Sequence, residues 1–274
     1  MGKLVLGTVQ FGLQYGVNSA GRPDENAVSD ILSEATKAGI TTLDTSSAYG
    51  NAEEVLGNCG TNNFKIVSKF PRGTASVEEK FCQSLSLLKK DSLYGYLLHH
   101  FEVYKNNAGV WDDFRKLRDQ HRVERIGFSL YEPFELDLLI KNHVDFNILQ
   151  IPFNLFDRKF EPYLRELHAE GVEIHVRSTF LQGLFFKDRN ALPEKLLPLK
   201  KYLQQLDDYS NESGLTISQL ALNYNLQYPY IDGVLIGVDN VRQLRENIEA
   251  ISNIHVELDF DIKEKELLNP VNWK

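Results

Sequence analysis

The sequence predicts an α/β protein folded as one (β/α)8 TIM barrel domain spanning residues 1–274. Apolar runs rich in Val, Ile and Leu recur eight times, and stretches with helical spacing of apolar residues separate them. The length of 274 residues is close to the roughly 250 residues typical of such barrels. Alternating strands and helices imply a parallel sheet, and closing that sheet removes both of its exposed edges.

Each predicted strand is a short run of residues that favour extended backbone. A doubly wound sheet that binds a dinucleotide is the main alternative, and it usually carries G-x-G-x-x-G after its first strand. The first run here continues as LGTVQFGLQYG, which lacks that pattern, so the barrel is favoured. In chain order the predicted strands lie in 4–11, 40–46, 65–70, 95–100, 125–130, 148–154, 173–180 and 233–238.

The predicted helices are recognised by their ends as well as by their spacing. Asp24 begins and Gly39 ends a stretch whose apolar residues recur with helical period. Two capping boxes mark further helix starts, one formed by Ser76 with Glu79 and the other by Thr216 with Gln219. Other helices are predicted around 111–118, 134–142 and 163–170, with an extra helix or lid in 187–211.

Composition and charge exclude several classes of partner. A hydrophobic content of 42% and a charged content of 25% are typical of a soluble globular protein. The net charge of −8 and the absence of a basic run argue against nucleic acid or an anionic membrane as partner. No signal peptide or membrane span is visible, and Cys59 and Cys82 lack metal-ligand spacing. We therefore expect a cytoplasmic protein with reduced thiols and no metal.

Four polar residues follow successive predicted strands and suggest a shared site. Asp44 and Tyr49 occur in TTLDTSSAYG, Lys69 in FKIVSKF and His99 in YGYLLHHF. In a parallel barrel the carboxyl ends of all strands meet at one rim, where active sites lie. Because strand alternation sends His99 and His100 to opposite faces, only one of them can belong to this site.

These residue types together can move a proton onto a carbonyl oxygen. A tyrosine loses its proton near pH 10, but a lysine charge about 4 Å away contributes roughly 4 kcal/mol, or about three pKa units. A carboxylate such as Asp44 would keep the buried lysine charged, and His99 could orient the carbonyl oxygen. Taken singly, each residue has a simpler explanation: Asp44 as a cap, Tyr49 as a loop aromatic, Lys69 as a solvated strand end, or His99 as a core group.

The segment DTSSAYGNAEEVLG, residues 44–57, together with SKF and YLLHH, resembles the aldo/keto reductase family. The resemblance runs from the first strand to about Ala250 and selects His99 over His100. It implies Tyr49 as general acid, Lys69 as the group that lowers its pKa, Asp44 as the carboxylate of the lysine, and His99 as the substrate-orienting residue.

The stretch IGVDNVRQLRENIEA resembles the part of the family that holds the adenosine phosphate end of NADP. Glycine permits close backbone approach, and a capped helix N-terminus attracts anions. The resemblance implies that Ser129 and Gln150 hold the nicotinamide amide and that Asn247 contacts adenine. The other cofactor-binding residues expected here are Gly237, Val238, Asp239 and Gln243, with Asn240 capping the helix.

Three departures from the family pattern concern the cofactor. Ser129 is followed by Leu130 where many members have Asn, so we expect one contact to the nicotinamide amide to be missing. Arg177 stands where many members have a tyrosine that stacks on the nicotinamide; a guanidinium plane can also stack, and the alternative for Arg177 is an internal ion pair. Asp239 stands where members often have a small or basic residue near the 2′-phosphate, which a carboxylate would repel. We therefore expect NADP as the family cofactor, with NAD as the alternative.

The expected activity is NAD(P)H-dependent reduction of an aldehyde or ketone by a monomer or weak oligomer. The opening GTVQFGLQYG resembles bacterial members associated with carbohydrate pathways, which points to a keto-sugar. The alternative is a nicotinamide-binding regulatory subunit with little turnover. A glycosidase would need a second carboxylate facing Asp44, and none is evident. Candidate substrate-lining residues near the strand ends are Gln10, Phe11, Tyr15, Phe101 and Phe156, together with Tyr131 and Phe180.

Overall fold

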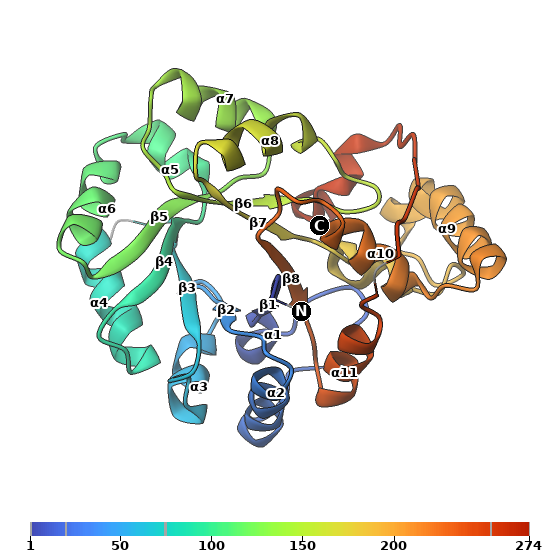
Figure 1. The fold of residues 1–274 in the computed structure, drawn as a ribbon, viewed down its shortest axis with the longest axis horizontal. Coiled ribbons are helices and arrows are strands. Elements are labelled where there is room, and N and C mark those ends of the chain that lie inside the picture. The colour runs from blue at the N-terminus through green and yellow to red at the C-terminus, as the bar shows by residue number, and fades with distance from the viewer. Residues whose placement is uncertain (1, 20, 74–75, 253, 274) are drawn as a thin grey trace.

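The computed structural model describes residues 2–19, 21–73, 76–252 and 254–273. Within them, eight parallel strands close into a barrel in chain order, and β1 pairs with β8 (Figure 1). The predicted fold class is therefore confirmed. The strands are β1 (Leu4–Gly7), β2 (Thr42–Asp44), β3 (Lys65–Phe70), β4 (Leu93–Leu98), β5 (Val123–Ser129), β6 (Ile148–Pro152), β7 (Glu173–Arg177) and β8 (Gly233–Gly237).

Helices surround the barrel, and most of the predicted ones are found close to their expected positions (Figure 1). Asp24 accepts a hydrogen bond from the Ala27 amide at 2.8 Å, and both capping boxes are formed. The main helices are α2 (Glu25–Lys37), α3 (Ala52–Cys59), α4 (Val77–Leu88), α6 (Val110–Asp119), α7 (Pro133–Lys141), α8 (Glu161–Ala169), α9 (Lys200–Ser213), α10 (Ile217–Leu226) and α11 (Val241–Glu249).

Shorter helical pieces fill the loops. The predicted extra element in 187–211 is a helix, α9, preceded by the 3-10 turn η2 (Glu194–Leu199). Figure 1 shows α9 at the outer edge of the molecule, so the lid interpretation of this segment is not supported. The remaining pieces are α1 (Val9–Gly12), α5 (Phe101–Asn106), η1 (Leu181–Phe186), η3 (Lys265–Leu268) and η4 (Pro270–Trp273).

Several predicted strands, among them those in 4–11 and 95–100, are too long at their carboxyl ends. β1 stops at Gly7 and the chain turns into α1, whereas the prediction continued the strand to Phe11. β4 stops at Leu98, so His99 and His100 lie beyond it and their rings stack 4.6 Å apart. The predicted opposite orientation of the two histidines is therefore wrong, because strand alternation no longer applies after the strand ends.

The strand register places the candidate residues at one rim of the barrel. Gly7 pairs with Asp44 on one side and with Gly237 on the other, and Ser129 pairs with Gln150. A methyl group on Gly127 would lie 1.7 Å from the Ile148 carbonyl oxygen, so this close strand contact requires glycine.

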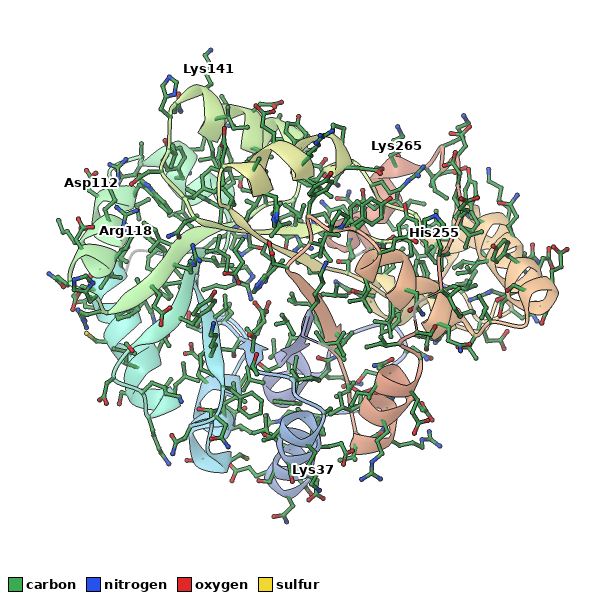
Figure 2. The ribbon with its side chains drawn as sticks, viewed as in Figure 1. Lys37, Asp112, Arg118, Lys141, His255 and Lys265 are labelled. Carbon is green, nitrogen blue, oxygen red and sulfur yellow. The ribbon has the colours of Figure 1, made fainter. Side chains whose placement is uncertain are left out.

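The apolar core is formed by buried residues of both the strands and the helices, and a few charged side chains, among them Asp44, Glu53 and Lys69, are buried as well. Val67, Leu97 and Ile148 form a smaller, separate apolar cluster. Figure 2 shows Lys141 and Lys37 at the ends of their helices, projecting from the outer surface of the molecule. In the part of the chain that the structure describes, no helix has the length and apolar character needed to cross a bilayer.

Candidate active site

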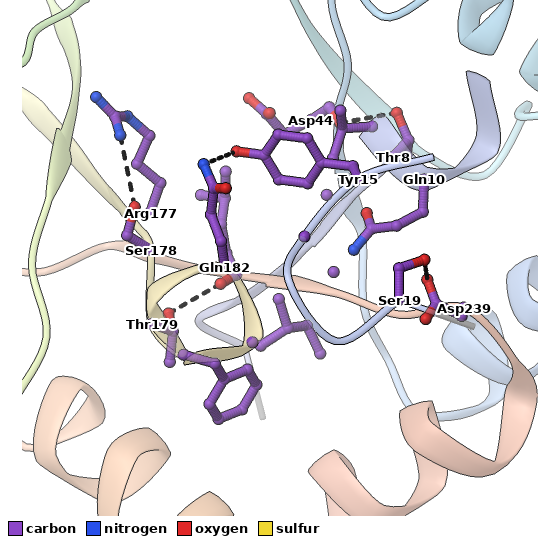
Figure 3. Close-up of a pocket in the computed structure, with 18 of the residues that line it drawn as sticks. Thr8, Gln10, Tyr15, Ser19, Asp44, Arg177, Ser178, Thr179, Gln182 and Asp239 are labelled. Atoms are coloured by element: carbon purple, nitrogen blue, oxygen red, sulfur yellow. Dashed lines mark hydrogen bonds between the residues drawn. The ribbon is translucent and has the colours of Figure 1, made fainter. Parts of the chain in front are cut away.

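A cavity of about 350 Å³ opens among the loops that follow the strands (Figure 3). Asp44, Tyr49 and His99 line it together with Ser129 and Gln150. Further wall residues come from the loops after β1, β7 and β8, so the cavity extends from Asp44, Tyr49 and His99 toward the start of α11, whereas Lys69 is buried behind its wall. Most of the predicted site residues are therefore brought to one place.

Lys69 is the centre of a buried hydrogen-bond network. Its fully buried ammonium donates to the Asp44 carboxylate at 2.6 Å, to the Thr45 carbonyl at 2.9 Å and to the Tyr49 hydroxyl at 3.3 Å. Three oxygens thus surround the charge, one of them anionic, as a buried ammonium requires.

Gln150 extends this network across the barrel. Its amide donates to the second Asp44 oxygen at 2.7 Å, and its own oxygen lies 3.4 Å from the Ser129 hydroxyl, which donates to it. Both residues line the cavity, where the sequence prediction expected them to hold a nicotinamide amide. One N–H group of the Gln150 side-chain amide is therefore already used to hold the Asp44 carboxylate in place.

The loop after β2 holds Tyr49 beside Lys69. The Tyr49 amide donates to the Ser46 carbonyl at 2.9 Å, closing a turn. α1 packs against this turn so closely that a methyl group on Gly12 would lie 1.8 Å from the Tyr49 carbonyl oxygen. The glycine in the first loop is therefore needed to place the tyrosine backbone.

The pKa of Tyr49 is raised well above 10 by burial and by Asp44 and Tyr131, with Arg177 opposing. Burial is the largest influence on this hydroxyl in the resting site, so the expected lowering of its pKa by Lys69 stays a prediction. Burial also lowers the pKa of Lys69, and Asp44 opposes that shift. At neutral pH the tyrosine retains its proton, and the ammonium 3.3 Å away can stabilise the anion formed when the proton leaves.

His99 is held as a neutral ring at the cavity wall. Its pKa is well below 6.5 because of burial and of the nearby charge on Lys69. Its Nδ1 lies 3.1 Å from the Ser46 hydroxyl, whose oxygen already accepts from the Ala48 amide. A Ser46 hydroxyl that donates to Nδ1 leaves the proton on Nε2, where it can be donated to a ligand. Ser46 was not predicted, although it lies only two residues after Asp44.

The residues after β8 form the other part of the cavity. The Gln243 side chain accepts from the Asp239 amide at 2.7 Å, and Asn240 caps α11 by accepting from the Gln243 amide at 3.0 Å. Asp239, Gln243 and Asn247 line the cavity, whereas the Val238 side chain is buried in the core. Ser19 donates to Asp239 at 3.4 Å and ties the first loop to this region (Figure 3).

These residues fit a nicotinamide dinucleotide. Gly237 lies next to the Gln10 side chain, whose amide nitrogen would be 2.4 Å from a methyl group at this position, and the Gln10 oxygen is buried without a hydrogen-bond partner. The capped start of α11 offers amides to a phosphate. In the described residues no group of three or more His, Cys, Asp or Glu side chains is arranged to hold a metal ion.

The predicted substrate residues separate into two groups. Gln10 and Tyr15 line the cavity, as do Tyr131 and Phe180. Phe11, Phe101 and Phe156 do not line it, because each is buried in the apolar core. Phe11 lies in α1 and Phe101 begins α5, and Phe156 is covered in part by the carboxyl-terminal segment. Phe101 packs against Tyr104 and Phe134, and Phe156 packs against Phe185, Tyr202 and Phe260.

Two loops that meet across the cavity were not predicted. Gln182 donates to the Tyr15 hydroxyl at 2.6 Å, and the Val17 amide donates to the Gln182 carbonyl at 3.0 Å (Figure 3). Ser178 and Gln182 have positive φ values of 64° and 52°, which non-glycine residues seldom adopt. No turn motif in the sequence marks these positions.

Comparison with known proteins identifies a family. The model of the aldo/keto reductase family matches residues 3–262. The uncharacterized oxidoreductase YqkF of Bacillus subtilis is 27% identical, covering 91% of each chain, and the L-galactose dehydrogenase of Arabidopsis thaliana is 24% identical, covering 84% of this chain and 79% of that one. An aldo-keto reductase from Bacillus halodurans in its holo form shares the fold, with a TM-score of 0.71, 20% identity and coverage of 97% and 90%.

Proposed function

The chain belongs to the aldo/keto reductase family, and from this premise we propose that it reduces an aldehyde or ketone to the alcohol with NADH or NADPH. The observation that supports this proposal most is the contact of 3.3 Å between the Lys69 ammonium and the Tyr49 hydroxyl at a cavity wall. A protonated phenol beside a cation is suited to giving a proton to an oxygen that becomes negative.

Ser129 and Gln150 would hold a nicotinamide at the cavity wall, and that group would supply the hydride that the carbonyl carbon accepts. Tyr49 donates its hydroxyl proton to the carbonyl oxygen, and the Lys69 ammonium stabilises the phenolate that remains. Asp44 keeps Lys69 charged and is itself held by Gln150. Neutral His99 donates a hydrogen bond to the same carbonyl oxygen and fixes its direction toward Tyr49.

Steady-state assays test the proposal against a regulatory role. NADH or NADPH would be mixed with the purified protein and a panel of aldehydes, ketones and sugar-derived carbonyls, and absorbance at the nicotinamide band would be followed. The similarity to an L-galactose dehydrogenase favours the sugar-derived members of the panel. A nicotinamide-binding regulatory subunit would bind cofactor yet leave every carbonyl unreduced.

We predict that Asp239→Ser tightens NADPH binding by about 5- to 10-fold, because the carboxylate repels the 2′-phosphate across the cavity. NADH binding should change by less than about 2-fold, since NADH lacks that phosphate. Fluorescence titration with both cofactors measures the effect, and Asp112→Ser removes the same charge from the outer surface as a control. Equal changes for both cofactors would show that Asp239 does not face the 2′ position.

The pH dependence of reduction follows from the two shifted groups. Tyr49 has a pKa above 10 and stays protonated below it, whereas His99 has a pKa well below 6.5 and stays neutral above it. Between about pH 6.5 and pH 9 neither group changes state, so kcat should vary by less than about 3-fold. A titration step in kcat centred near pH 6.5 that disappears in His99→Gln would contradict the neutral assignment of His99.

A further inference from the structure

Arg177, which the sequence analysis expects to stack on the nicotinamide, is the charged cavity residue that takes no part in the proposed proton transfer. It ends β7 and lines the cavity together with Tyr49 and His99. Its guanidinium lies over the Tyr131 ring, 4.1 Å from the centroid, and donates to the Leu130 carbonyl at 2.9 Å. These two contacts hold the group in place without neutralising its charge.

The other charged residues that line the cavity either pair with a group of opposite charge or lie in the part of the cavity near α11, away from Tyr49 and His99. Asp44 is paired with buried Lys69, and Arg242 lies 3.5 Å from Glu246 on α11. Among the described residues, no carboxylate lies within ion-pair distance of Arg177. Because Tyr49 is protonated and His99 is neutral, the part of the cavity around these two residues has a net positive charge, which Arg177 supplies.

Arg177 also has donors to spare. Its Nη1 has only a long contact of 3.5 Å to the Ser178 hydroxyl, and its Nε is buried without a partner. A planar guanidinium with spare donors binds a carboxylate in a bidentate manner more favourably than it binds water. A partly buried cation without an anion is costly, and a bound anion removes that cost.

We propose that Arg177 binds an anionic group of the substrate, so that the carbonyl compounds preferred by this protein are oxo acids or sugar acids carrying a carboxylate. The proposal rests on the proposed function, since it assigns the substrate class of the same site. An anion near Arg177 could also come from the cofactor phosphates, and the experiment below separates the two sources.

The test uses a matched pair of aldehydes, 4-carboxybenzaldehyde and its methyl ester, which differ chiefly in charge. In the wild-type protein we expect kcat/KM to be about 10-fold or more higher for the carboxylate. Arg177→Met should lower kcat/KM for the carboxylate by about 10- to 100-fold and for the ester by less than about 3-fold. Lys141→Met removes a positive charge from the outer surface (Figure 2) and should leave the ratio unchanged.

A binding measurement makes the test independent of turnover. Calorimetric titration with 4-(hydroxymethyl)benzoate, the alcohol product, should show a Kd about 10-fold or more weaker in Arg177→Met than in wild type. Unchanged product binding, or equal losses for acid and ester together with weaker NADH and NADPH binding, would overturn the proposal and assign Arg177 to the cofactor. Failure of the wild-type protein to reduce either aldehyde, with product binding still dependent on Arg177, would count against the proposed function alone.

Discussion

Tyr49→Phe is expected to lower kcat for carbonyl reduction by about 100- to 10,000-fold, the range for loss of a positioned general acid. The ring remains and only the hydroxyl that contacts Lys69 is lost, so the cavity should keep its shape. The dissociation constants of NADH and NADPH should therefore change by less than about 2-fold. A large loss of kcat with intact cofactor binding separates a chemical role from a structural one.

Tyr163→Phe is the matched control for this variant. Tyr163 lies on α8 and its hydroxyl donates to exposed Asp137 at 2.9 Å, outside the cavity. Its loss should leave both kcat and cofactor binding unchanged. Wild-type turnover in Tyr49→Phe would remove Tyr49 from the acid role, whatever group then supplied the proton.

Breaking the buried pair of Lys69 and Asp44 is expected to have the largest effect on stability. Lys69→Met leaves the Asp44 carboxylate buried with only Gln150 as a side-chain donor, and Asp44→Leu leaves the ammonium without its anion. Each single substitution should lower the free energy of unfolding by about 3–5 kcal/mol. The double variant should be more stable than either single one, because no unpaired charge remains.

Chemical denaturation followed by circular dichroism measures these differences. The exposed pair of Lys116 and Asp113, at 2.9 Å on α6, provides the comparison, since breaking such a pair costs at most about 1 kcal/mol. Additive losses in the double variant would show that the two residues do not stabilise one another. Activity cannot replace this measurement, because both substitutions remove groups next to Tyr49.

The strands and capped helices could be predicted because they depend on local rules. The helical spacing of apolar residues and the capping boxes at Ser76 and Thr216 involve residues only a few positions apart in the sequence. Such short-range patterns can be recognised without the fold. The convergence of Asp44 and Lys69 followed from one further rule, that the carboxyl ends of parallel barrel strands share a rim.

Other features depend on contacts between distant segments or on loop backbone. The bond from Gln150 to Asp44 joins β6 to β2 across the barrel interior, and no sequence pattern reports such a distance. The stacking of His99 on His100 depends on where β4 ends, and strand ends are poorly defined by apolar runs. The pKa of Tyr49 is raised mainly by burial of its hydroxyl, and the sequence does not show how deeply a side chain is buried.

A crystal structure of the protein with oxidised nicotinamide cofactor and an unreactive carbonyl compound tests the central claim most directly. We predict that the carbonyl oxygen lies about 2.6–3.2 Å from both the Tyr49 hydroxyl and the His99 Nε2. The Lys69 ammonium should remain in contact with the same hydroxyl. A carbonyl oxygen bound elsewhere in the cavity, with Tyr49 directed away from it, would contradict the proposed proton transfer.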